Sequence, residues 1–310
     1  MSTDTAAAPS FSLKRNGVEI IDTFAEAFPI TGTRVIITAV TAKWARIAAM
    51  VMTGNATSVI ACDVEAAIER RLTVDETPDG RPGISVLVFA FSRDALAKAL
   101  TGRVGQSVLT CPTTGCYNGV AGAPKDKQIS IGGQLRFFGD THQSSKKLES
   151  RRFWRIPVMD GEFICEDRFG TVKGVAGGNL LICGVEQAAA LSAAEHAARA
   201  IRRLPDVIMP FPGGIVRSGS KVGSKYKKLK ASTNDAYCPT LRAVVASELP
   251  AEAGAVYEIV IDGLSPEAVQ GAMRAGLHAA CDTPGVVRVT AGNYGGKLGP
   301  YHFHLRELLD

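Results

Sequence analysis

The sequence has no apolar run of the about 18 to 20 residues that a membrane-spanning helix needs, so it predicts no membrane contact. Its first ten residues also lack the basic and apolar segments of a secretory signal. We therefore expect a cytoplasmic protein whose residues 1–13 form a disordered tail.

Cysteines are few and their spacing is uninformative. The seven cysteines are an odd number spread over 310 residues, which excludes the disulfide framework of a small secreted protein. No Cys-x2-Cys pair is present, and Cys111 and Cys116 have neither a second pair nor a nearby histidine to complete a zinc site. The sequence thus predicts no metal centre. Cys238 could be a nucleophile, but no histidine lies near it in the sequence.

Phosphate-loop signatures are absent as well. Neither Gly-x-x-x-x-Gly-Lys-Ser/Thr nor Gly-x-Gly-x-x-Gly occurs. The string from Gly292 to Lys297 therefore favours a tight backbone bend over a phosphate cradle. An enzyme acting on nucleotides or phosphate esters is a minor alternative.

The net charge of +5 is modest, but five lysines lie between positions 221 and 230. Only one aromatic residue, Tyr226, lies among them, whereas a surface that stacks nucleic-acid bases needs several. We predict no nucleic-acid partner. The cluster is either a solvated loop or a surface that attracts a polyanionic ligand tail or an acidic partner.

The chain contains an internal repeat. Its length suits two domains of about 150 residues. The string Ile21-Asp-Thr-Phe24 resembles Glu166-Asp-Arg-Phe169, 145 residues later, and the segment from Ser92 to Leu100 resembles that from Ser265 to Met273 at an offset of 173. Two matches in the same order favour a duplication.

Apolar periodicity predicts similar elements in the two halves. Ser92 and Ser265 are the expected N-caps of one helix in each half. The pattern predicts an α+β protein of two ferredoxin-like (split βαβ) lobes at residues 14–155 and 156–310. The expected strands are 34–40, 57–62, 84–90, 180–184 and 256–261, the helices 43–52, 92–101, 188–204 and 265–281, and the long inserted loops 73–82 and 210–230.

Several glycine-rich and polar strings occur that this architecture does not require. Together, and in this order, they resemble those of the formylmethanofuran–tetrahydromethanopterin formyltransferase family from about Asn16 to the C-terminus. The strings are Asn16-Gly-Val-Glu-Ile20, Asp22-Thr-Phe-Ala-Glu-Ala-Phe28, Glu76-Thr-Pro-Asp-Gly-Arg-Pro-Gly83, Gly174-Val-Ala-Gly-Gly-Asn179, Pro210-Phe-Pro-Gly-Gly-Ile-Val216, Ser220-Lys-Val-Gly-Ser-Lys225, Ser232-Thr-Asn-Asp-Ala-Tyr-Cys-Pro239 and Ala291-Gly-Asn-Tyr-Gly-Gly-Lys-Leu-Gly299.

The resemblance implies a homo-oligomeric enzyme that moves a formyl group between N5 of tetrahydromethanopterin and the amine of methanofuran or an analogue. Both coenzymes are then substrates, and no cofactor is bound. The net basic, Ala- and Arg-rich composition looks bacterial. In a methylotrophic host, the enzyme would serve formaldehyde oxidation to formate, as one subunit of a formyltransferase/hydrolase complex. The alternative is a non-catalytic carrier-binding or scaffold subunit of such a complex.

Glu258 is the candidate catalytic residue. It is a lone carboxylate in the apolar string Val256-Tyr-Glu-Ile-Val-Ile261. Burial would raise its pKa toward the range of a general acid, and the proposed catalytic glutamate of the family aligns here. A carboxylate that faces solvent, or one paired with a buried cation, is the alternative.

The candidate substrate-binding residues are polar and lie in the second half. Asn234, Asp235 and Tyr237 could bind pterin edges or orient the formyl oxygen, or could simply hold a turn. The lysines of the 220–225 loop could bind carboxylates of a ligand tail. The complete predicted set is Ser220, Lys221, Ser224, Lys225, Asn234, Asp235, Tyr237, Asn293 and Lys297.

Overall fold

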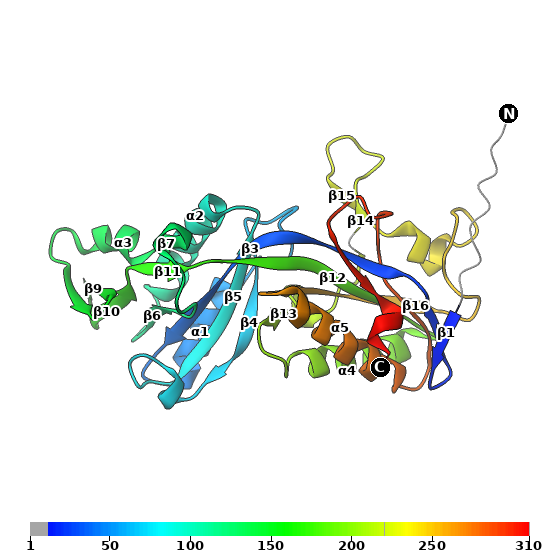
Figure 1. Cartoon of the computed structure of the whole chain (residues 1–310), viewed down its shortest axis with the longest axis horizontal. Coiled ribbons are helices and arrows are strands. Elements are labelled where there is room, and N and C mark those ends of the chain that lie inside the picture. The colour runs from blue at the N-terminus through cyan, green and yellow to red at the C-terminus, as the bar shows by residue number, and fades with distance from the viewer. Residues whose placement is uncertain (1–11, 220, 310) are drawn as a thin grey trace.

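The computed structural model of the chain describes residues 12–219 and 221–309. Each half contains a unit of the order β–α–β–β–α–β (Figure 1). The first unit consists of β3 (Phe24–Thr38), α1 (Ala42–Met52), β4 (Glu65–Leu72), β5 (Gly83–Ala90), α2 (Arg93–Arg103) and β6 (Gly115–Asn118). The second unit consists of β12 (Val172–Gly184), α4 (Gln187–Ile201), β13 (Val207–Ile208), β16 (Ala255–Gly263), α5 (Pro266–Cys281) and β17 (Val286–Thr290).

The strand order confirms the ferredoxin-like prediction for both units. It is β4-β5-β3-β6 in the first unit and β13-β16-β12-β17 in the second. Helices α1 and α4 begin at Ala42 and Gln187, and α2 and α5 begin at Arg93 and Pro266. These starts reproduce the offsets of 145 and 173 found in the sequence repeat.

The two predicted helix caps are also confirmed. The side chain of Ser92 accepts a hydrogen bond from the backbone N–H of Ala95, and that of Ser265 accepts one from Ala268, each at 3.2 Å. Each bond satisfies one of the backbone donors that a helix N-terminus leaves without an intrahelical partner. One turn further on, Leu96 of α2 is fully buried in its unit.

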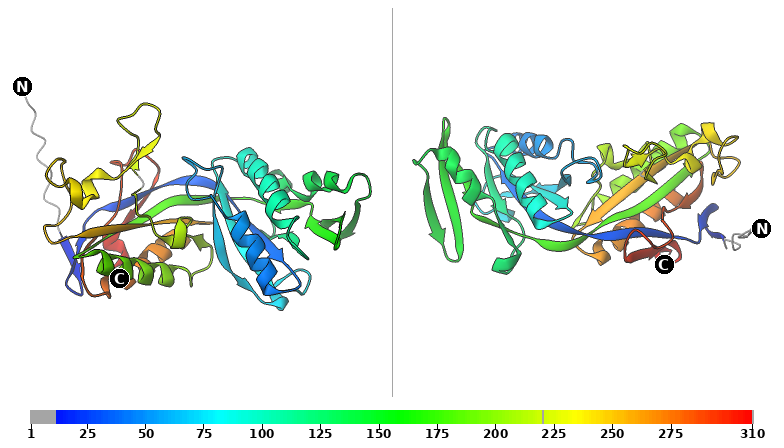
Figure 2. Two further views of the ribbon diagram at one scale, coloured as in Figure 1. Left: turned by 180° about the vertical axis from the view of Figure 1, so that it is seen from behind. Right: turned by 90° about the horizontal axis from the view of Figure 1, so that it is seen from above.

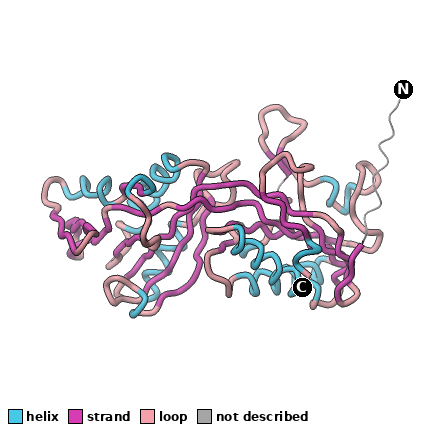
Figure 3. Tube along the Cα trace, in the orientation of Figure 1, coloured by secondary structure: helices cyan, strands magenta, loops and turns pink. Residues whose placement is uncertain are grey.

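Strands β3 and β12 join the units into one sheet. They are antiparallel neighbours from Gly32 opposite Val172 to Phe28 opposite Ala176. In Figures 2 and 3 both strands run through the middle of the elongated molecule. Gly32 is required at this junction because a Cβ there would lie 2.6 Å from the ring of buried Phe89.

The helices of the second unit lie on one face of its sheet, and loops cross the other face (Figure 1). One hydrophobic core lies against α1 and α2, and another lies against α4 and α5. Ile20 and Ala25 belong to the core with α4 and α5, whereas Ile156 and Phe163 belong to the core with α1 and α2. Both cores therefore draw on residues from either side of position 155, and the boundary expected there stays a prediction.

Smaller elements extend the sheet or stand beside it. Strands β8, β9 and β10 lengthen the sheet beyond β6, and β18 pairs with the start of β3. The short β14 and β15 form a separate hairpin. These elements are β7 (Gln128–Ser130), α3 (Gly132–Leu135), β8 (Ser144–Leu148), β9 (Arg151–Val158), β10 (Gly161–Glu166), β11 (Arg168–Gly170), β14 (Lys221–Val222), β15 (Ala231–Ser232) and β18 (Tyr301–His304).

The predicted tail over residues 1–13 is too long at its C-terminal end. Residues 1–11 lie outside the described part of the chain, but β1 (Ser12–Arg15) pairs with β2 (Val18–Ile21). The turn between the two strands is Asn16-Gly17, and both residues have positive φ values. An Asn-Gly pair of this kind closes tight hairpins, so the first strand begins before position 14.

The strand predicted over residues 57–62 is wrong. Its amides serve local contacts instead: Ala61 and Cys62 donate to the carbonyl of Ser58, and Val59 donates to the carboxylate of Glu65. The strand that follows α1 is β4, in which charged residues such as Arg70 and Arg71 interrupt the apolar pattern. The apolar run at 57–62 therefore does not indicate a strand, because the segment folds into local turns.

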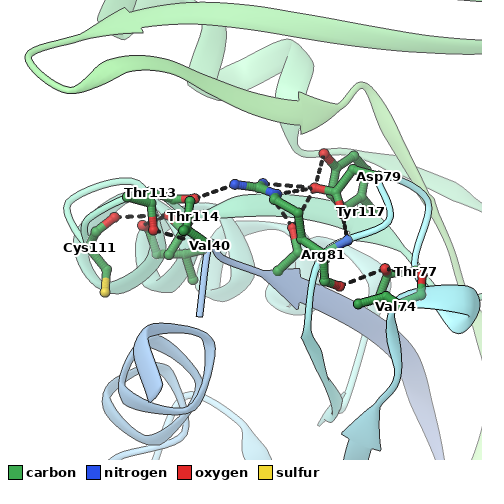
Figure 4. Close-up of polar contacts among 11 residues, drawn as sticks. Val40, Val74, Thr77, Asp79, Arg81, Cys111, Thr113, Thr114 and Tyr117 are labelled. Atoms are coloured by element: carbon green, nitrogen blue, oxygen red, sulfur yellow. Dashed lines mark hydrogen bonds and ion pairs between the residues drawn. The ribbon is translucent and has the colours of Figure 1, made fainter. Parts of the chain in front are cut away.

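The loop over residues 73–82 is present and is fastened to the first unit (Figure 4). One carboxylate oxygen of Asp79 accepts hydrogen bonds from Thr38 at 2.7 Å, Arg81 at 2.8 Å and Tyr117 at 2.9 Å. Burial would raise the pKa of Asp79, but these bonds hold it below its usual value. Arg81 also donates to the carbonyl of Thr113 at 2.6 Å. The string around Asp79 thus has a structural role.

Candidate active site

A cavity of about 560 Å³ lies on the sheet face of the second unit that its helices leave uncovered. Ile259 and Ile261 of β16 pack in the core under the helices, so the alternate residue Glu258 faces the other way. Six of the predicted site residues line this cavity, namely Lys221, Asn234, Asp235, Tyr237, Asn293 and Glu258.

Glu258 lies in the floor of the cavity with 3% of its surface exposed. Its backbone N–H and C=O are both paired with Val216, at 3.0 and 2.7 Å, and it lies opposite Leu181 of β12. Backbone pairing on both sides, with strand β12 on one and with Val216 alone on the other, holds the carboxyl group in a fixed position. The burial that the sequence predicts is confirmed.

Lys221 and Asp235 form an ion pair in the cavity wall. The Nζ of Lys221 lies 2.6 Å from Oδ1 of Asp235. The hydrogen bond from Lys221 lowers the pKa of Asp235 below its usual value. Asp235 and Tyr237 belong to one 3-10 turn (Asp235–Tyr237), so these residues both line the cavity and hold a turn.

Tyr237 and Glu248 form a second polar pair in the wall. The Tyr237 hydroxyl donates to Oε2 of Glu248 at 2.5 Å. Burial and the neighbouring Glu248 raise the pKa of Tyr237, so its hydroxyl stays protonated. Arg288 donates to the backbone carbonyl of Glu248 at 2.9 Å and to the carboxylate of Glu19 at 2.6 Å.

Asn293 lines the cavity, but its side-chain amide is already bonded within the protein. The Nδ2 group donates to Oγ1 of Thr23 at 3.0 Å and to the carbonyl of Phe24 at 3.2 Å. Behind it, Oδ1 of Asn179 accepts from the backbone N–H of Gly292 at 2.8 Å. These bonds fasten the 291–299 segment to strands β3 and β12.

The remaining predicted residues do not line the cavity in the described part of the chain. Lys225 and Lys297 are exposed, and Ser224 accepts a hydrogen bond from the backbone of Tyr226 at 3.1 Å. Ser220 lies outside the described residues. The substrate-binding role assigned to each residue stays a prediction.

The sequence did not single out several residues that line the cavity. They come from four separate segments: Asn179, Glu248, Arg288 and Tyr294. Asn179 and Tyr294 belong to the quoted strings, so a candidate set made of every polar residue in those strings would contain both. Glu248 and Arg288 stand in ordinary loop and strand sequence and carried no signal.

Residues 12–219 and 221–309 contain no cluster of three or more His, Cys, Asp or Glu side chains that could hold a metal ion. No helix within the same ranges is both long enough and apolar enough to cross a membrane.

Two family models together match nearly the whole chain. The model described as formylmethanofuran-tetrahydromethanopterin formyltransferase matches residues 13–158, and that described as FTR, proximal lobe, matches residues 161–308.

Known formyltransferases of this name are similar to the chain over almost their full length. That of Methylobacillus flagellatus is 58% identical, covering 95% of this chain and 99% of the relative. A subunit of the formyltransferase/hydrolase complex of Methylorubrum extorquens is 55% identical, covering 95% and 97%.

Solved structures agree with these matches. The formyltransferase from Methanosarcina barkeri superimposes with a TM-score of 0.90 at 50% identity, covering 96% of this chain and all of that one. The formyltransferase/hydrolase complex from Methylorubrum extorquens, solved with methylofuran, gives a TM-score of 0.93 at 54% identity, covering 97% and 99%. The chain therefore belongs to the formylmethanofuran–tetrahydromethanopterin formyltransferase family and is an enzyme of formyl transfer in one-carbon metabolism.

Proposed function

We propose that the 560 Å³ cavity is where the formyl group passes directly between the two coenzymes, with Glu258 as the acid–base group. The observation that carries this proposal is a carboxyl group, 3% exposed, held by a rigid strand in the floor of a polar cavity. Carboxyl groups in such surroundings favour the protonated form that a general acid needs.

The reaction requires one proton to move between two nitrogens. The amine of the furan coenzyme attacks the formyl carbon, a new C–N bond forms, and the bond from that carbon to N5 of the pterin breaks. The attacking amine loses a proton and N5 gains one. Glu258 delivers its proton to N5 and takes one from the amine, so the carboxyl group ends the cycle unchanged. No enzyme nucleophile is needed, because the cavity holds both reactants together.

The walls of the cavity offer complementary groups for the pterin. Tyr237 donates its proton to Glu248, so the phenol oxygen can still accept, and so can the second carboxylate oxygen of Glu248. The aminopyrimidine edge of a pterin presents N–H donors. We assign that edge to Tyr237 and Glu248, with N5 directed toward Glu258.

The lysines suit the negatively charged parts of the ligands. Lys221 lies in the cavity wall, and Lys225 with its neighbouring lysines lies outside it. A flexible lysine attracts an anion without fixing its geometry. We assign to them the acidic tail of a furan-type carrier, with Ser224 and Lys297 retained as predicted contacts.

We further propose a cytoplasmic enzyme that works with other subunits. The Methylorubrum extorquens relative carries the name of a formyltransferase/hydrolase complex subunit. Within such a complex, flux from the formyl-pterin to the formyl-furan would end in hydrolysis to formate. Isolation of the chain from its host at native abundance tests this assembly. A homo-oligomer free of hydrolase subunits contradicts it.

A Glu258→Gln variant tests the catalytic role. The amide keeps the shape of the side chain but cannot carry the proton, so kcat should fall by about 10² to 10⁴ with little change in KM. Transfer is followed by the loss of formyl-pterin absorbance in the presence of the furan coenzyme. Glu252→Gln, an exposed residue outside the cavity, is the matched control. Undiminished turnover by Glu258→Gln refutes the acid–base role.

A further inference from the structure

Glu26 of β3 is a buried carboxylate that does not line the cavity but bonds to the backbone of Tyr294, which does. It is 1% exposed, and its two oxygens accept hydrogen bonds from four backbone N–H groups of a single segment. Oε2 accepts from Tyr294 at 2.7 Å and from Gly296 at 3.0 Å. Oε1 accepts from Leu298 and, at 3.0 Å, from Gly299.

The glycines of the 291–299 segment make this arrangement possible. Gly295 and Gly296 have φ values of +66° and +76°, which curve the chain so that its amides converge on one point. A Cβ on Gly299 would overlap the carbonyl oxygen of Ala27 in β3. The segment therefore has the glycine content of an anion-binding loop, and the anion that it surrounds is a side chain of the same protein.

Only an ionised carboxylate satisfies this loop. A carboxylate has two oxygens and about four acceptor positions. Burial would raise the pKa of Glu26, but the bonds from Tyr294, Gly299, Leu298 and Gly296 hold it below its usual value. A glutamine would accept with one oxygen and would direct its own N–H groups at two of the amides.

The loop also connects Glu26 with the segment that carries Lys221, another residue lining the cavity. Asn293 and Tyr294 line the cavity directly. The Tyr294 hydroxyl accepts a hydrogen bond from the backbone N–H of Val222 at 2.9 Å. Val222 follows Lys221, the cavity residue paired with Asp235.

We propose that Glu26 is a positioning residue for formyl transfer, which holds the 291–299 segment so that Asn293 and Tyr294 shape the substrate cavity and Tyr294 fixes the strand that carries Lys221. This inference rests on the proposed cavity but not on the acid–base role of Glu258. Glu26 touches no substrate in this arrangement and acts through the loop.

The first experiment compares Glu26→Gln with Glu166→Gln. Glu166 is also buried and accepts a backbone hydrogen bond, from Asn118 at 2.9 Å, but it lies away from the cavity. For Glu26→Gln we expect kcat/KM to fall by about ten- to a hundred-fold, mainly through KM, whereas Glu166→Gln keeps its kinetic constants even where its Tm falls. A folded Glu26→Gln protein whose KM values stay within about twofold of the wild type overturns the proposal.

A double-mutant cycle on kcat/KM tests the path through the loop. If Glu26 acts by placing Tyr294, then Tyr294→Phe should cost less in the Glu26→Gln background than in the wild type. Strictly additive losses overturn the proposal. If Glu26→Gln does not fold, Gly296→Ala distorts the same loop at a positive φ while Glu26 itself stays a carboxylate. Unchanged KM values for that variant overturn the proposal as well.

The tests of Glu26 and of Glu258 can fail independently of each other. A fully active Glu258→Gln enzyme removes the acid–base role and leaves the loop experiment intact. Conversely, normal KM values in Glu26→Gln remove the positioning role and leave Glu258 untouched.

Discussion

The buried carboxyl groups of Glu65 and Asp262 lie next to each other where the two units meet, one on β4 and the other on β16. Glu65 accepts a hydrogen bond from the backbone N–H of Val59 at 3.1 Å, and Asp262 accepts one from Gly177 at 3.3 Å. Burial raises the pKa of both groups, and the charge of Glu65 raises that of Asp262 further. The pair therefore retains a proton under conditions in which isolated carboxyl groups have lost theirs.

This pair makes stability depend on pH. Above about pH 4 the unfolded chain loses protons that the folded pair keeps, so the free energy of unfolding falls as pH rises until the folded pair also ionises. Asp262→Asn should remove up to about 1.4 kcal/mol per pH unit from this slope. Urea unfolding between about pH 5 and pH 8 measures the difference. Asp75→Asn, at an exposed site, is the control. Parallel pH curves for wild type and Asp262→Asn would contradict the prediction.

Arg34 should be a strong contributor to stability. It donates to Glu69 at 2.7 and 2.8 Å and also pairs with Asp206 of the second half. Burial would raise the pKa of Glu69, but the bonds from Arg34 and Ser85 lower it overall. The contribution of Glu69 is therefore present at neutral pH and is lost as the pH falls through its lowered pKa.

Arg34→Met leaves the Glu69 carboxylate buried without its cation. We expect a loss of about 3 to 5 kcal/mol in the free energy of unfolding, measured by urea titration. The matched control is Arg155→Met, which breaks an exposed ion pair with Glu162 and should cost at most about 1 kcal/mol. Equal losses in the free energy of unfolding for the two substitutions would show that burial of the Glu69 carboxylate does not increase the cost of removing its cation.

Tyr237→Phe should weaken binding of one coenzyme selectively. It removes the phenol oxygen that we assign to the pterin edge and the hydroxyl bonded to Glu248, and a buried donor left without its partner costs about 1 to 3 kcal/mol. KM for the pterin coenzyme should rise by about tenfold or more, with KM for the furan coenzyme nearly unchanged. Separate titration of each coenzyme checks this, with Glu252→Gln as control. A rise confined to the furan coenzyme would reverse the assignment of the two sites.

Lys221→Gln should affect the binding of an acidic carrier and its dependence on salt. The substitution removes a cavity cation and releases Asp235 from its ion pair. KM for the furan coenzyme should rise at low salt and lose part of its salt dependence, because screening acts on the removed charge. KM measured at low and at high ionic strength tests this. Lys98→Gln on α2, an exposed lysine of the first unit, is the control. Unaltered salt dependence in Lys221→Gln excludes the role.

The sequence predicted those parts of the fold that local chemistry determines. Ser92 and Ser265 marked helix starts because a hydroxyl at that position satisfies a free backbone N–H. The strand β4 was missed because its residues, such as Arg70, follow no clean alternation, and its place is set by pairing with β5. The strand propensity of a segment carries no information about the distant strand with which it pairs.

For the candidate site, the sequence located residues within strings but not residues that arrive from elsewhere. Glu258 stood out because a charge is rare in an apolar strand. Glu248 did not, because its relation to Tyr237 arises only when a loop folds over the sheet. Lys297 was predicted as a site residue because it stands in the same string as Asn293. It is exposed, however, and is not among the described residues that line the cavity.

The long strands β3 and β12 also restrict how the enzyme can move. Within the described residues 12–219 and 221–309, each of these strands continues from one unit into the other without a break, so the two halves share one sheet. A hinge would have to break several neighbouring backbone hydrogen bonds at once. We therefore expect substrates to enter and leave the proposed cavity through movement of the loops around Lys221 and Tyr294, with little change in how the two halves are placed.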